Sequence, residues 1–178
     1  MLTPRLVRAV AAAGAFLCAA LAAKPAQAQF ANHSIGFEAG YVYVANPAAQ
    51  NVGSGFDLGV NSTLYIESGF DLYFRILVGI HKQRLPEQNV VGILPAVGFR
   101  YLFSEDTVRP YLGLNLAYQA YITDEYSSRF ALAPQAGIEF FVAENFSIGF
   151  QTEYHLVLSL NAPPEHGVIG LGRVGWYF

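Results

Sequence analysis

Cysteine and basic residues are scarce in this sequence. The 178-residue chain has one cysteine, Cys18, and only 13% of its residues are charged. A single cysteine excludes both a disulfide framework within the chain and a cysteine-rich metal site. After residue 28, Lys and Arg are scattered singly. We therefore expect no nucleic-acid partner, because such partners require a basic patch.

Long apolar runs are also missing, although 53% of the residues are hydrophobic. No segment after residue 28 has the roughly 18 consecutive apolar residues of a membrane-spanning helix. The hydrophobic residues alternate with others instead. In "GFDLYFRILVGI" (69–80), every even position is apolar, and Asp71 and Arg75 stand between them. This alternation indicates β-strands, because successive side chains of a strand point to opposite faces.

The N-terminus has the features of a secretory signal peptide. Arg5 and Arg8 precede an apolar stretch at 9–23, and Ala26-Gln27-Ala28 is an A-x-A cleavage site. We expect residues 1–28 to be removed and residues 29–178 to form one domain. Retention as an anchor is the lesser alternative, because the apolar stretch is short. Cleavage removes three positive charges and no acid, which changes the net charge from −3 to −6.

Turn residues divide the rest of the chain into eight expected strands. Most reach the roughly 9 to 11 residues that a tilted membrane strand needs. The second is the weakest prediction, because "GVNSTLYIES" (59–68) contains no clear turn. The expected strands are 34–45, 54–63, 67–81, 90–103, 109–121, 130–142, 145–157 and 167–178.

One face of these strands is apolar, and its aromatic residues gather near both strand ends. Such paired belts mark membrane interfaces. Tyr41 and Tyr43 lie near one end, and Tyr101, Phe103, Phe140, Phe146, Trp176 and Phe178 lie near the other. The opposite face carries Glu38, Asp57, Asp71, Arg75, Arg100, Glu139, Glu153, His155 and Arg173.

These patterns predict an all-β fold: an eight-stranded antiparallel transmembrane up-and-down β-barrel with its charges in the lumen. A soluble lipocalin-like barrel, which buries its apolar face, is the alternative. In the membrane barrel, "SEDT" (104–107) and "AEN" (143–145) are short periplasmic turns. The expected outer loops are 46–53, 82–89, 122–129 and 158–166.

The sequence resembles the small eight-stranded outer-membrane barrels of the OmpA/OmpX/OmpW-like, porin-related group of Gram-negative bacteria. The resemblance rests on "RPYLGLNLAYQ" (109–119), on the hairpin "AGIEFFVAENFSIGFQTEY" (136–154) and on the ending "GRVGWYF". It implies an outer-membrane location, contact with outer-membrane lipid, a monomer, and no further domain after the last strand. It also implies delivery by periplasmic chaperones to the barrel-assembly machinery, which would read Trp176 and Phe178 as its signal.

Several motifs suggest chemistry, and each has a more ordinary structural explanation. "GLGRVG" (170–175) matches G-x-G-x-x-G, but no helix can follow it in the three remaining residues. Glu139 and Glu153 would lie on adjacent strands and could share a proton as an acid–base pair. We favour their membership of an interior network with Arg75, Arg100 and Arg173, because charges confined in a narrow barrel need compensation.

"YHLVLSLNA" (154–162) is the strongest enzymatic indication. Some outer-membrane lipid A deacylases have a similar cluster of His, Ser and Asn-Ala. Their His and Ser are two apart in sequence, whereas His155 and Ser159 are four apart. Both residues are also expected to face the lumen, away from a lipid substrate. An interior of eight strands is just filled by side chains, here including Tyr73, Leu77, Leu94, Leu102, Tyr111 and Phe141.

We therefore expect a non-enzymatic outer-membrane barrel with a structural or surface-interaction role. A narrow conduit for small apolar solutes is the first alternative, and a lipid-modifying enzyme is the second. No cofactor or metal is expected.

Overall fold

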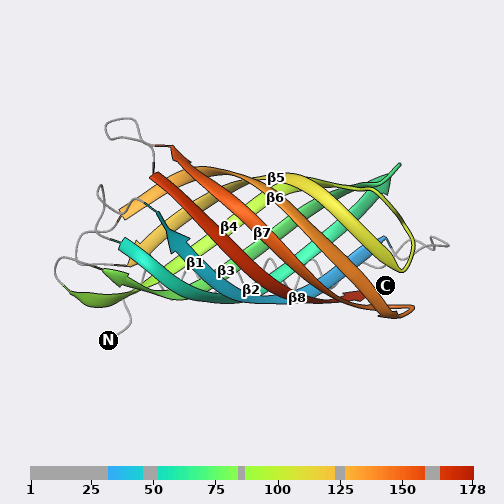
Figure 1. Ribbon diagram of the computed structural model, residues 1–178, viewed down its shortest axis with the longest axis horizontal. Coiled ribbons are helices and arrows are strands. Elements are labelled where there is room, and N and C mark those ends of the chain that lie inside the picture. The colour runs from blue at the N-terminus through green and yellow to red at the C-terminus, as the bar shows by residue number, and fades with distance from the viewer. Residues whose placement is uncertain (1–31, 46–51, 84–86, 123–126, 159–164) are drawn as a thin grey trace, which may run out of the picture. The chain divides into compact units, whose positions relative to one another are not determined.

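The computed structural model describes residues 32–45, 52–83, 87–122, 127–158 and 165–178. The predicted signal peptide lies outside the described residues. Eight strands form one closed barrel in sequence order (Figure 1). They are β1 His33–Val44, β2 Val52–Glu67, β3 Phe70–Gln83, β4 Gln88–Leu102, β5 Val108–Ile122, β6 Ser127–Ala143, β7 Phe146–Leu158 and β8 Glu165–Tyr177.

Every strand pairs antiparallel with its neighbours in sequence, and β1 pairs with β8 to close the barrel. Closure leaves no unpaired edge strand, so the backbone N–H and C=O groups are satisfied within the wall. The predicted eight-stranded antiparallel barrel is confirmed. Within the described residues, no helix is both long and apolar enough to cross a membrane.

Short turns connect the strands at one end of the barrel, which we call the turn end; the opposite end is the loop end. The turn end carries the connections 103–107 and 144–145, close to the two predicted turns, and it is the end marked C in Figure 1. It also carries a two-residue turn that the sequence analysis missed. Ser68 and Gly69 adopt positive φ values of 53° and 83°, as a tight hairpin turn requires.

The strands differ from their predicted bounds mainly at β2, β6 and β8. β2 was expected to end at 63 but continues to Glu67. β6 begins at Ser127 and β8 at Glu165, inside two of the expected outer loops. The extra residues continue the alternation of inward and outward side chains. As a result, Arg129 and Glu165 are buried in the barrel interior rather than exposed on loops.

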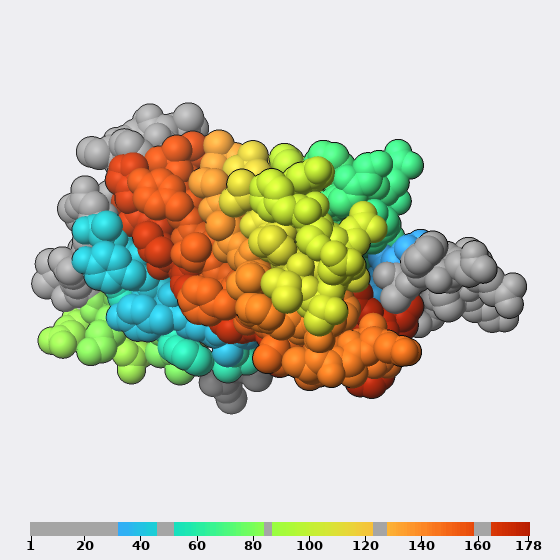
Figure 2. All heavy atoms as spheres, turned by 45° about the vertical axis from the view of Figure 1, so that its right-hand side comes forward, coloured from blue at the N-terminus to red at the C-terminus, as the bar shows by residue number. Residues whose placement is uncertain are grey.

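The apolar face of the wall points outward, opposite to the lipocalin-like alternative. Phe37 and Leu58 are 67% and 60% exposed, and the even-numbered side chains from Phe70 to Ile80 follow the same pattern. Aromatic contacts gather at the turn end, where the rings of Phe70 and Tyr101 lie 5.0 Å apart. Figure 2 shows one side of this exterior, where bulky side chains of β5 to β7 cover the strands.

Two prolines interrupt the pairing of the wall. At Pro95, the pairing of β4 with β3 continues, whereas its pairing with β5 skips residues 94 and 95. At Pro134, β6 remains paired with β5, whereas its pairing with β7 skips residues 133 and 134. Because proline has no N–H, it cannot donate a hydrogen bond to the neighbouring strand.

Candidate functional site in the barrel lumen

The inward side chains form a charge cluster in the half of the lumen nearer the turn end. Arg100 of β4 lies 2.5 Å from Asp71 of β3 and 3.4 Å from Glu139 of β6. Glu139 also accepts a 2.7 Å contact from Arg173 of β8 and a 2.7 Å hydrogen bond from the Tyr177 hydroxyl. Two arginines thus share one carboxylate.

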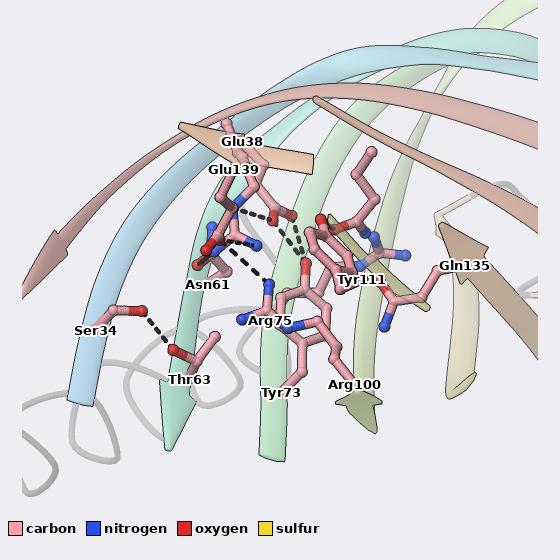
Figure 3. Close-up of polar contacts among 12 residues, drawn as sticks. Ser34, Glu38, Asn61, Thr63, Tyr73, Arg75, Arg100, Tyr111, Gln135 and Glu139 are labelled. Atoms are coloured by element: carbon pink, nitrogen blue, oxygen red, sulfur yellow. Dashed lines mark hydrogen bonds and ion pairs between the residues drawn. The ribbon is translucent and has the colours of Figure 1, made fainter. Parts of the chain in front are cut away.

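Tyrosines extend this cluster across the lumen. The Tyr73 hydroxyl donates to Glu38 at 2.6 Å, and Glu38 lies 4.0 Å from Arg173. The guanidinium of Arg100 stacks over the Tyr111 ring, 4.6 Å from its centroid. Figure 3 shows these side chains converging from strands on different sides of the barrel. Cation–π contacts of this kind help to compensate a desolvated arginine.

Arg75 and Glu153 form the central ion pair of the lumen. Arg75 of β3 donates two hydrogen bonds to Glu153 of β7, at 2.5 and 2.6 Å. Glu153 also accepts from Asn115 at 3.0 Å and from Gln151 at 2.5 Å. Both charged side chains have no solvent exposure. The bidentate geometry is the one in which arginine and carboxylate interact most strongly.

An apolar ring follows on the loop-end side of these charges. Along β3 the inward residues run Asp71, Tyr73 and Arg75, and then Leu77. The ring is made of buried side chains in two adjoining clusters. They are Val42, Leu77, Leu94, Ile169 and Leu171, and Ala96, Ala117, Ala131 and Val157.

Charged residues return between the ring and the loop end. His81 lies 2.9 Å from Asp57, and its ring meets Tyr121 edge-on at 5.2 Å. Arg129 forms an ion pair with Glu165. His81 and Asp57 lie within expected strands, whereas the sequence analysis assigned Arg129 and Glu165 to the outer loops 122–129 and 158–166. Arg129 and Glu165 could have been found by extending the alternation of inward and outward residues beyond the expected strand bounds.

His155 connects the central pair to this outer group. One ring nitrogen lies 2.8 Å from Glu153 and the other lies 3.0 Å from Gln119. A small cavity beside them has a volume of about 20 Å³ and is lined in part by Arg129 and Glu165. That volume holds about one water molecule. Beside His155, the described side chains therefore leave room for about one water molecule.

The structure places all nine predicted lumen residues inside the barrel: Glu38, Asp57, Asp71, Arg75, Arg100, Glu139, Glu153, His155 and Arg173 are buried. Glu139 and Glu153 do not hydrogen-bond to each other. Each carboxylate is instead bound to arginine, Glu139 to Arg100 and Arg173 and Glu153 to Arg75.

The structure places the other sequence motifs as follows. The G-x-G-x-x-G match at 170–175 is straight strand within β8. His155 faces the lumen, and Ser159 lies outside the described residues. The described ranges contain no cluster of His, Cys, Asp and Glu suited to a metal ion. Trp176 points outward at the turn end, and Phe178 stacks on His33 at 6.2 Å.

Several solved structures share this fold. Neisserial surface protein A has a TM-score of 0.63 and 17% identity, over 83% of this chain and 97% of that one. OprG from Pseudomonas aeruginosa has a TM-score of 0.59 and 12% identity, over 86% and 99%. The outer membrane enzyme PagL has a TM-score of 0.50 and 16% identity, over 80% and 98%. This chain is similar to them in fold. No family model and no curated protein sequence matches it.

Proposed function

We propose that this chain is a non-enzymatic integral outer-membrane protein with a structural or surface-interaction role. The filled lumen is the observation that carries the proposal. The apolar ring formed by Leu77, Leu94 and Ile169 lies between two polar groups, and these three side chains have no solvent exposure. A permeation path would have to displace them. This packing argues against a conduit for solutes.

The exterior supports a membrane location. Large apolar side chains face outward around the wall, and aromatic residues gather at both ends, including Trp176 at the turn end and Tyr118 with Phe130 toward the loop end. In water such a surface would aggregate, whereas hydrocarbon solvates it. Barrels of the same fold include outer-membrane proteins. We therefore place this chain in the outer membrane.

The pairing of the carboxylates supports a non-enzymatic role. An acid–base catalyst needs a carboxyl or imidazole within reach of substrate. Glu139 and Glu153 are buried and bound to arginine side chains. His155 lies between Glu153 and Gln119 in the interior. None of these three groups faces the lipid that a lipid-modifying enzyme would act on.

Membrane extraction, planar-bilayer recording and a lipid A assay together test the proposal. We expect the protein in the outer-membrane fraction, with a heat-dependent change in gel migration, no steady single-channel current, and no release of acyl chains from purified lipid A. Recovery in the soluble periplasmic fraction would contradict the membrane location. A reproducible current would favour the conduit, and acyl release would favour the enzyme.

A further inference from the structure

A recess lies on the barrel wall at the loop end, over the ends of β1 to β4. Its volume is about 890 Å³, which is within the usual range for ligand sites of roughly 300–1,000 Å³. The hollow follows the small residues Gly53, Ser54 and Gly55 of β2, where the register between β2 and β3 shifts. Its described lining also includes Tyr41, Phe56, Ile80, Lys82 and Glu87.

At Gly55, beside the recess, the wall of the barrel accepts no larger side chain. A Cβ atom at Gly55 would collide with the carbonyl oxygen of Ile80 and with the His81 ring. The Ser54 hydroxyl accepts a hydrogen bond from the Val44 amide at 3.1 Å, which holds the serine side chain against β1. The recess therefore lies over a stretch of β2 that consists only of the small residues Gly53, Ser54 and Gly55.

The lining changes from apolar to polar toward the loop end. Tyr41, Phe56 and Ile80 pair across β1, β2 and β3 and form an exposed apolar row. This row is continuous with the rest of the outward-facing apolar surface. Two residues further along β3, Lys82 is exposed and pairs with Asn89 of β4. From the barrel wall toward the loop end, the recess thus presents first the apolar row and then the Lys82 ammonium group at its rim. A membrane lipid presents its acyl chain and its headgroup in the same order.

We propose that this recess binds one phosphate-bearing membrane lipid, with an acyl chain on the Tyr41–Phe56–Ile80 row and the phosphate at the Lys82 ammonium group. The inference rests on the proposed membrane location. Glu87 also lines the rim and weakens the attraction for a free anion. The acyl chain therefore contributes the larger part of the binding, and inorganic phosphate alone does not occupy the site.

Fluorescence quenching by brominated lipids tests the site directly. Tryptophan is introduced by Tyr41→Trp in a Trp176→Phe background, and the full-length protein, recovered from membranes, is reconstituted in vesicles of phosphatidylcholine. Dibrominated phosphatidylglycerol should quench the introduced tryptophan at lower mole fraction than dibrominated phosphatidylcholine. One lysine at an anionic lipid surface changes this preference about fivefold, and Lys82→Gln should abolish it.

Two controls separate the site from general lipid contact. Arg109→Gln removes a cation at the turn end and should leave the preference unchanged. The original chain with Trp176 reports on that end and should show no effect of Lys82→Gln. Equal quenching by both lipids, or a preference that survives Lys82→Gln, would overturn the proposal, as would protection of the introduced tryptophan by a second copy of the chain.

Failure of the lipid site is distinguishable from failure of the membrane proposal. Heat-dependent gel migration of each variant shows whether the barrel has inserted. An inserted barrel without headgroup preference rejects the lipid site alone. A chain that does not insert into vesicles rejects both.

Discussion

Two adjoining levels of the lumen are filled by different chemistry. On the turn-end side, carboxylates bind Arg75, Arg100 and Arg173, and tyrosine hydroxyls donate hydrogen bonds to two further carboxylate oxygens. On the loop-end side of these charges, Leu77 and Leu94 pack in an apolar ring. The ring keeps water away from the central ion pair, and electrostatic interactions strengthen when water is excluded. The difference indicates that the apolar ring closes the lumen, whereas the charged cluster joins distant strands.

Breaking the central ion pair should have the largest effect. Arg75→Met leaves Glu153 as a buried charge without its arginine, which should lower the free energy of unfolding by about 3–5 kcal/mol. Urea unfolding in lipid vesicles, followed by Trp176 fluorescence, measures the change. The double variant Arg75→Met/Glu153→Gln should recover most of the loss, because the unpaired charge is gone. A double variant as unstable as the single one would mean that the charge is not the cause.

Truncating the apolar ring should cost somewhat less. Leu77 has no solvent exposure, and Leu77→Ala should lower the free energy of unfolding by about 2–5 kcal/mol through lost contacts and a cavity. Leu58→Ala is the matched control on the outward face, where lipid can fill the space, and its cost should be smaller. Equal losses in the same urea titration would show that the ring is loosely packed.

Placing a charge on each side of one strand tests the assignment of the faces. Leu114 faces outward and Asn115 inward. Leu114→Lys should lower the free energy of unfolding of the barrel in vesicles by about 2–4 kcal/mol. Asn115→Lys should cost less, because the interior accepts another cation more readily. The buried charged side chains include six acids and four arginines.

Crowding at position 115 makes the order of the two effects, rather than their size, the decisive result. Asn115 donates to Glu153 and accepts from Gln135 at 3.0 Å, and a lysine loses the second contact. If Asn115→Lys is the more damaging change, the outward face does not meet lipid.

Restoring a backbone donor in the wall should have the smallest effect, and it should stabilise. Pro95→Val supplies an N–H where the pairing of β4 with β5 is interrupted. One hydrogen bond typically adds about 0.5–1.5 kcal/mol to the free energy of unfolding. Amide hydrogen exchange at β5 should slow in parallel. Pro134→Val should act in the same way between β6 and β7, and unchanged exchange in both variants would contradict the explanation.

The sequence was sufficient to predict the fold and the facing of each strand, because alternation is a local property. The Ser68–Gly69 turn was missed because the alternating pattern runs up to it without a strong turn signal such as Asn-Gly. Arg129 and Glu165 were missed as interior residues because the sixth and eighth strands were predicted to begin too late, at 130 and 167 rather than at Ser127 and Glu165.

The sequence pattern could not predict which interior charges pair with one another. Arg75 and Glu153 lie on β3 and β7, strands that are not adjacent in the barrel. Their contact depends on how far each strand is displaced along its neighbours around the whole circuit. Parity predicts that both side chains point inward, but it does not give their heights in the lumen. The recess at the loop end was likewise invisible, since it follows from a register shift in β2.

The pairing of β1 with β8 also bears on the order of folding events. Glu38 faces Arg173 across this contact, and the two residues lie near opposite ends of the sequence. Hairpins such as β6–β7 need to close only a short loop, so we expect β1 and β8 to meet after the other strands have assembled. On this expectation the chain passes through an open sheet whose two edges are β1 and β8, and the interior charges stay uncovered until these strands pair.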